Sequence, residues 1–196
     1  MTYSEINQAV AKLVKKYDER DPFRLCRAMG IKLIFQAMGK APDAVKGFFL
    51  ESKRIRTITV NSDLPEVIQR IIVAHEICHA EYHRKSGIHA FHEVAMFDHT
   101  SEFEKDANLF AAELLLEDKE VLEVLNRDTT FFSAAAMLLV PAELLDFKFR
   151  VMKWKGFKMI EPPINARSNF IEIWKSRRMQ IFTRKNRGTQ WLYLKW

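Results

Sequence analysis

The chain has 196 residues, 48% of them hydrophobic, and a formal net charge of +6. This length and composition indicate one globular domain, with room for a small appendage. The longest uncharged run, residues 129–142, is too short to cross a bilayer, and the polar N-terminal residues show no signal peptide. The chain has two cysteines, and their spacing is not that of a fold stabilised by several disulfide bonds. We therefore expect a cytoplasmic protein that makes no membrane contact.

The first 60 residues predict two helices followed by a small sheet. Residues 4–17 place apolar side chains on one helical face, and a second short helix follows Pro22 and ends before Gly30. Three β-like runs come next, over residues 31–36, 46–50 and 56–60. We expect these runs to form an antiparallel sheet that precedes the central helix of the chain.

That central helix carries the motif H-E-x-x-H. We expect it to begin near Pro65 and to end at Gly87. In a helix, His75 and His79 lie one turn apart on one face, where two imidazoles can bind one zinc ion. Glu76 lies about 100° around the axis, from where it can reach a water in an open coordination position and take its proton.

The apolar residues before the motif predict that its histidines face the core. Ile68, Ile71 and Ile72 form a stripe at helical spacing, and His75 and His79 continue that stripe. Buried imidazoles need partners, and one metal ion can serve both. The alternative is a pair of core histidines that hydrogen-bond to other groups. The sequence favours a zinc site with one Zn²⁺ per chain.

A hydrolytic zinc site needs a third protein ligand. The metzincin pattern is excluded, because this chain has Tyr82 and Lys85 where that pattern has glycine and histidine. Several residues remain as candidates: Cys26, His83, His89, His92, His99, and a carboxylate on the following helix. On that helix, residues 101–116, Glu104 and Asp106 flank the core stripe by similar angles, so periodicity does not choose between them. Glu104 could also complete a capping box with Ser101.

Two motifs together resemble a known family. H-E-I-C-H at residues 75–79, followed by E-x-x-A-N-x-F-A-A-x-L-L at 104–115, is similar to the ImmA/IrrE metallopeptidases, which are gluzincin-like. The resemblance covers about residues 31–152, and the family usually has glycine in place of Cys78. It implies that Glu104 is the third zinc ligand and that Asn108 orients a ligating histidine.

The resemblance also frames two open questions about substrate binding. In gluzincin-like folds an edge strand can hold an extended substrate, and either residues 56–60 or the strand before them could be that edge. An oxyanion intermediate needs a stabilising Tyr or His. The candidates for that role are Tyr82, His83, His92 and His99.

The second half of the chain predicts three helices and a basic tail. Residues 118–125, 129–138 and 141–154 read as helices, and the last two resemble a degraded helix-turn-helix. The position of its recognition helix is too apolar to read bases, so we expect it to pack against the core; the residues concerned are Leu144, Leu145, Phe147 and Phe149.

Charge changes abruptly near residue 150. Residues 1–149 carry 19 basic and 23 acidic side chains, net −4, whereas residues 150–196 carry 12 and 2, net +10. The tail alternates aromatic and basic residues around a turn at 186–188, which predicts a β-hairpin or a small three-stranded sheet. Such a surface can bind nucleic acid or an acidic protein, or it can be a solvated basic face.

We therefore predict an α+β protein, with a mainly helical zincin-like core, a small antiparallel sheet and a basic β-rich C-terminal segment. The expected parts are a metallopeptidase domain at 1–125, a helix-turn-helix-like extension at 126–155 and a basic aromatic segment at 156–196. The resemblance implies a regulatory zinc endopeptidase that cleaves a helix-turn-helix repressor of phage or mobile-element type. The basic and aromatic pattern of 156–196 allows contact with nucleic acid. The alternative is a vestigial zincin that binds a repressor or DNA without cutting, but an intact Glu76 favours the enzyme.

Overall fold

The computed structural model describes residues 1–41, 44–83, 100–126, 129–168, 171, 180–186 and 189–195, without the side chains of 100, 101, 180–186 and 189–195. Two helices open the chain, α1 (Tyr3–Tyr17) and α2 (Pro22–Ala28). Thr2 and Glu5 form a capping box at the start of α1, and Asp21 caps α2 just before its Pro22. Both helices agree with the sequence prediction.

The sheet holds β1 (Lys32–Gln36), β2 (Gly47–Ser52) and β3 (Ile55–Asn61), in the order β1-β3-β2. β2 and β3 are antiparallel, joined by a tight turn in which Lys53 and Arg54 both have positive φ. β1 and β3 are parallel, so the prediction of an antiparallel sheet was wrong for this pair. The reason is that the chain crosses from β1 to the far edge before β3 returns to the centre. Residues 56–60 therefore form the central strand, and β1 and β2 are the edges.

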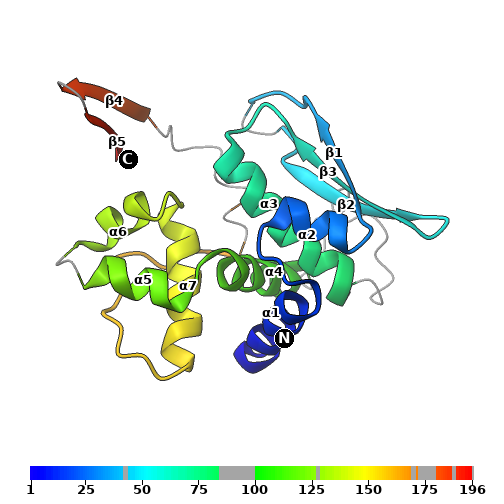
Figure 1. Cartoon of the computed structure of the whole chain (residues 1–196), viewed down its shortest axis with the longest axis horizontal. Coiled ribbons are helices and arrows are strands. Elements are labelled where there is room, and N and C mark those ends of the chain that lie inside the picture. Colours follow the sequence, from blue (N-terminus) through cyan, green and yellow to red (C-terminus); the bar gives the residue numbers. More distant parts are fainter. Residues whose placement is uncertain are drawn as a thin grey trace.

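The sheet lies directly against α3 (Glu66–Cys78), the helix that carries the motif (Figure 1). Gly47 of β2 marks the contact, because a Cβ there would lie 2.5 Å from Cγ2 of Ile72 and 2.9 Å from the carbonyl oxygen of Thr59. Only glycine allows so close an approach. α3 begins after Pro65 and continues into a π-helical turn, η1 (His79–His83), whereas its predicted end at Gly87 lies outside the described residues.

Helix α4 (Thr100–Leu115) crosses α3 and occupies the middle of the molecule, where it also contacts α1 and α7 (Figure 1). Its core stripe is fully buried at Ala107, Phe110 and Leu114. Ser101, considered as an N-cap for this helix, lies inside it. α4 is thus the element on which the two halves of the core meet.

The remaining helices are α5 (Asp118–Leu125), α6 (Phe131–Met137) and α7 (Ala142–Trp154), on the other side of α4 from the sheet (Figure 1). All four apolar residues of the expected recognition helix are fully buried in α7, which confirms that they pack into the core: Leu144, Leu145, Phe147 and Phe149. The tail forms the predicted hairpin, β4 (Gln180–Asn186) antiparallel to β5 (Thr189–Lys195). No helix in the described part of the chain has the length and apolarity needed to span a membrane.

Candidate metal centre

Three side chains from two helices converge on one point. His75 and His79 come from α3 and the start of η1, and Glu104 comes from the first half of α4. Nε2 of His75 lies 3.0 Å from Nε2 of His79 and 3.0 Å from Oε2 of Glu104, and Oε1 of Glu104 lies 3.4 Å from Nε2 of His79. The three ligand atoms all lie within 4.8 Å of one another. Two imidazoles and one carboxylate form the donor set of catalytic zinc sites that keep a fourth position open.

The apolar stripe of α3 carries the histidines into the core, as the sequence predicted. His75 is 4% and His79 1% exposed, and Ile68, Ile71 and Ile72 before them are buried. Burial of two imidazoles is unfavourable unless their ring nitrogens find partners. For each ring, Nε2 faces the cluster, and Nδ1 faces a residue outside it.

Asn108 holds the outer side of the His75 ring. Its Oδ1 lies 2.9 Å from Nδ1 of His75, and Asn108 itself is fully buried. Because an amide oxygen only accepts, Nδ1 of His75 donates this hydrogen bond, and in the neutral ring the lone pair is on Nε2, which faces Glu104 and His79. This is the arrangement expected of a residue that orients a metal ligand.

His83 holds the corresponding side of the His79 ring. Its Nδ1 lies 2.9 Å from Nδ1 of His79, across the π-helical turn, and its Nε2 lies 3.9 Å from Oδ2 of Asp106. Asp106 in turn accepts a hydrogen bond from the α-amino group of Met1. The structure therefore turns Asp106 toward His83 and the chain start, and Glu104 toward the cluster, a choice that periodicity left open.

Glu76 offers the test of whether the site suits a metal and its water. The side chain is 4% exposed, and its Oε2 has no hydrogen-bond partner among the described residues. A buried carboxylate oxygen without a partner is strongly unfavourable, so it needs a ligand, an ion or a water at that position. The residues present fit a zinc ion with a reactive water beside it.

The charges in the site favour a cation. Burial lowers the pKa of His75, but the charge of Glu104, its hydrogen bond to the ring and the charge of Glu76 outweigh burial and leave that pKa raised. Burial likewise raises the pKa of Glu104, but the two imidazoles outweigh burial and leave that pKa lowered. The two carboxylates thus draw positive charge to His75, and a dication can take that place.

Comparison with known proteins places this geometry in a family. The model of the IrrE N-terminal-like domain, peptidase M78, matches residues 26–150. The chain belongs to the ImmA/IrrE family. The chain is also similar to "Uncharacterized immunity region protein 2" of Bacillus phage phi105. The two are 33% identical over 146 residues, which are 74% of this chain and 90% of the relative. The resemblance drawn from the two motifs is confirmed.

The other residues considered for the ImmA/IrrE site lie elsewhere. The Tyr82 hydroxyl donates to the carbonyl oxygen of Ala9, 3.4 Å away, and burial raises the pKa of Tyr82 to about 12. Burial likewise raises the pKa of Cys26 to about 12, and this thiol is buried on α2 outside the cluster. The remaining candidates lie outside the described residues: His89, His92 and His99.

Sequence reasoning missed two contacts of this ImmA/IrrE centre. The contact between His83 and His79 could have been predicted from their spacing, since residues four apart lie on one helix face. The second contact joins the Nδ2 group of Asn108, which donates, to the carbonyl oxygen of Ser168. Nothing in the sequence indicates that contact, because 60 residues separate its partners.

Proposed function

We propose that this protein is a single-zinc endopeptidase that cleaves a transcriptional repressor. The observation that carries the proposal is the buried Oε2 of Glu76, which has no hydrogen-bond partner among the described residues and belongs to the residue that follows His75. A purely structural zinc site closes its fourth position and needs no base. A buried, unsatisfied carboxylate next to the ligands suits a general base.

His75, His79 and Glu104 would hold the zinc ion, and Asn108 and His83 would orient the two histidines. A zinc ion there would supply Lewis-acid activation of water and of the substrate carbonyl. Glu76 accepts the proton of the attacking water and returns it to the nitrogen of the leaving amine. Burial of the site excludes bulk water from that proton transfer, which strengthens each electrostatic interaction in it.

The sheet offers a place for an extended substrate. β3 is central, so of the two strands considered as the edge only β2 remains. Gly47 brings β2 into contact with Ile72 of α3, within one helical turn of His75. A substrate segment that pairs with β2 would bind through main-chain hydrogen bonds, with little dependence on its sequence.

The substrate class rests on the phage relative, whose name places it in an immunity region. Immunity in that sense depends on a repressor, so we propose a helix-turn-helix repressor of phage or mobile-element type as the substrate. The cytoplasm, where such a repressor works, is the proposed location. The basic segment at 156–196 is proposed to bind that repressor or its DNA, since its 9 basic and 2 acidic side chains, net +7, suit an acidic partner.

The test starts from the neighbouring gene, where a helix-turn-helix repressor would be the substrate to try. Purified protein is loaded with one equivalent of zinc and incubated with that repressor, and fragments are identified by mass spectrometry. We expect a specific cut that Glu76→Gln abolishes and that a chelator prevents. Binding of the repressor without any cut would instead support the vestigial alternative.

A further inference from the structure

The segment that follows α7 returns to the metal centre. Residues 157–168, here called the return segment, lie beyond the matched family region of 26–150 and have no helix or strand. They leave the end of α7 and run back toward α4 (Figure 1). Phe157, Met159 and Ile164 pack against the core, and Ala166 is 8% exposed. The segment is therefore part of the folded body.

Two residues of α7 anchor the return segment near its end. Asp146, itself buried, accepts a hydrogen bond of 2.9 Å from the backbone N–H of Ala166 and pairs with Arg150 one turn away. Arg150 Nη2 donates to the side-chain oxygen of Asn165 at 2.9 Å and to the carbonyl oxygen of Ala166 at 2.7 Å. These contacts hold the backbone two residues before Ser168 in one position.

The end of the return segment determines how the Asn108 amide is oriented. Its NH₂ group donates to the carbonyl oxygen of Ser168, and its oxygen accepts from Nδ1 of His75. If the amide flipped, the NH₂ group would face the N–H of His75 and the oxygen would face the Ser168 carbonyl, giving two repulsive contacts. A fixed Ser168 carbonyl therefore fixes the tautomer of His75 and points its Nε2 lone pair at the cluster.

We propose that the return segment is a positioning element of the metal centre, which acts through Asn108 on the zinc ligand His75. The inference rests on the proposed zinc site. The new element is that residues 157–168, which lie beyond the family region and are anchored by Asp146 and Arg150, influence the affinity of that site for zinc. By linkage, zinc bound at His75 must stabilise the return segment to the same extent.

Arg150→Met tests the proposal, with Lys153→Met as a matched control. Arg150 and Lys153 both lie on α7 and both contact the return segment. Among the described residues Lys153 pairs with Glu161 alone, at an exposed site seven residues before Ser168, whereas Arg150 binds Asn165 and Ala166. Zinc affinity is measured on full-length, folded variants by competition with a chromophoric chelator. We expect Arg150→Met to weaken zinc binding about tenfold, as loss of an outer partner does, and Lys153→Met to leave it unchanged. Equal affinities in the two variants would overturn the proposal.

Hydrogen exchange of the unmodified protein gives a second test, which holds even if Arg150→Met fails to fold. Amide exchange is followed by mass spectrometry with and without one equivalent of zinc. We expect zinc to slow exchange in residues 164–168 more than in α6, which serves as the internal reference. Equal slowing in both segments would overturn the proposal and leave the peptidase assignment intact. A wild-type protein that binds no zinc would overturn both.

Discussion

Two carboxylates on the same helix, α4, one buried and the other half-buried, have opposite surroundings. Glu113, near the C-terminal end, lies 2.6 Å from the ammonium groups of both Lys148 and Lys155. Those lysines also pair with Asp118, so two carboxylates meet two ammonium groups in an ion cluster made of Glu113, Asp118, Lys148 and Lys155. Glu104, near the N-terminal end, meets only His75 and His79, and no lysine or arginine among the described residues pairs with it.

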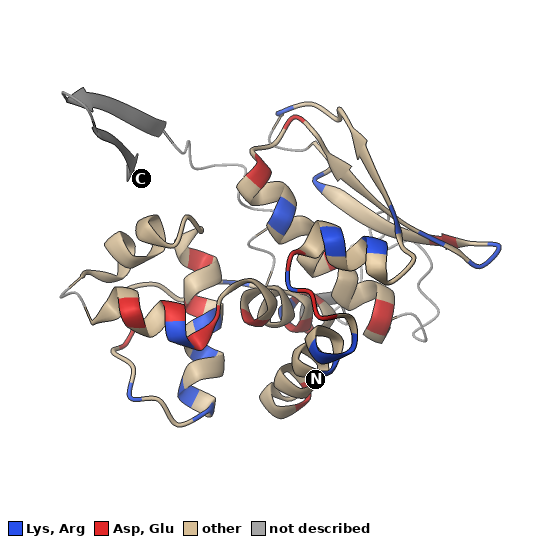
Figure 2. Ribbon diagram, in the orientation of Figure 1, with Lys and Arg blue, Asp and Glu red and all other residues tan. Residues whose placement is uncertain are grey.

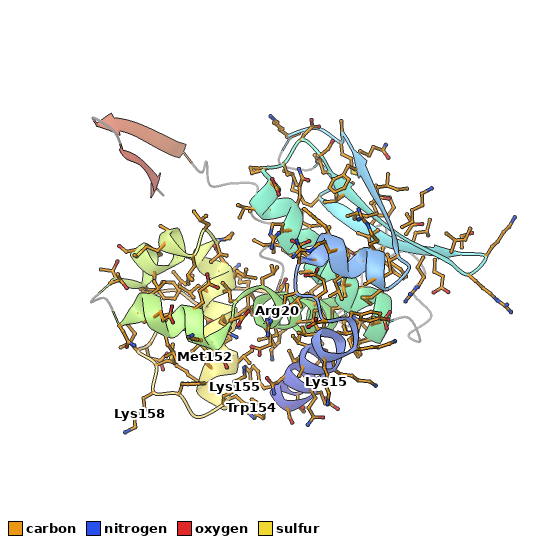
Figure 3. The ribbon with its side chains drawn as sticks, viewed as in Figure 1. Lys15, Arg20, Met152, Trp154, Lys155 and Lys158 are labelled. Carbon is orange, nitrogen blue, oxygen red and sulfur yellow. The ribbon has the colours of Figure 1, made fainter. Side chains whose placement is uncertain are left out.

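The difference separates a site in which the chain pairs its carboxylates with lysines from one in which it does not. In the ion cluster the chain supplies its own cations, and Lys148 is 1% exposed, so nothing further can bind. Charged residues of both signs gather there (Figure 2). In Figure 3 Arg20 lies beside α4 and Lys155 at the lower end of α7. Arg20 donates to the carbonyl oxygens of Glu113 and Leu114. In the metal centre Glu76 and Glu104 carry two negative charges that one dication would match. On the proposed function, the N-terminal end of α4 is the one that binds the zinc ion.

The largest effect is expected at the base of the metal centre. Glu76→Gln should keep the fold and one zinc per chain but lower the rate of repressor cleavage by about 10²–10⁴, because an amide cannot accept the proton of water. Single-turnover cleavage and metal analysis measure the two quantities. Glu143→Gln is the control, since that carboxylate also has an oxygen without a hydrogen-bond partner in the described part of the chain but lies on α7. A Glu76→Gln protein that cuts at the wild-type rate would refute the mechanism.

The ion cluster should govern stability and not zinc binding. Lys148→Met leaves two carboxylates with one lysine, and loss of one partner of a buried pair typically destabilises by about 3–5 kcal/mol. Denaturant unfolding measures this loss. Lys119→Met is the control, because its pair with Glu123 is exposed and worth at most about 1 kcal/mol. Zinc affinity should stay at the wild-type value in both, and a weaker affinity in folded Lys148→Met would mean that the two ends of α4 are coupled.

The choice between the two carboxylates near the metal centre can be checked by zinc content. Glu104→Ala removes a proposed ligand and should weaken zinc binding by about 100-fold or more, above the range for outer partners. Asp106→Ala should retain stoichiometric zinc, since its carboxylate faces Met1 and His83. The reverse pattern of zinc loss would exchange the roles of the two residues.

A smaller effect is expected at His83. His83→Phe keeps the ring volume but removes the nitrogen beside Nδ1 of His79, so zinc affinity should fall about tenfold. Cleavage at saturating zinc should be close to the wild-type rate. If zinc affinity is unchanged while the rate constant for cleavage falls, His83 acts on the oxyanion, as the sequence also allowed.

The smallest effect is the contribution of Asp118, in the ion cluster, to the pH dependence of stability. Burial raises the pKa of Asp118, but its hydrogen bonds to Lys148 and Lys155 outweigh burial and leave that pKa below its usual value. A lowered folded pKa contributes stability that is present above the unfolded pKa, near 3.9, and is lost as pH falls through the folded value. Between pH 5 and pH 2, about the range of that titration, wild-type protein should lose unfolding free energy more steeply than Asp118→Asn. Parallel slopes in denaturant unfolding would contradict this.

Local sequence determined where helices and the hairpin form and which side of the helix carries the histidines of the motif. Helical spacing alone put His75 and His79 on the buried stripe of α3, because the angle between residues four apart depends only on the helix. Caps at Thr2 and Asp21 marked two helix starts for the same local reason. The apolar α7 and the hairpin of the tail also followed from spacing and turn residues.

Only the tertiary structure decided which groups meet at those positions. Spacing gave Glu104 and Asp106 equal angles about α4, and the crossing of α4 over α3 turned one to the cluster and the other to Met1. Strand order in the sheet depended on where the chain crossed after β1. The β-like runs in the sequence do not predict that crossing. The contact of Asn108 with Ser168 joins residues 60 apart in the chain. Periodicity specifies a direction from a helix axis, but the neighbour found in that direction is set by packing between distant segments.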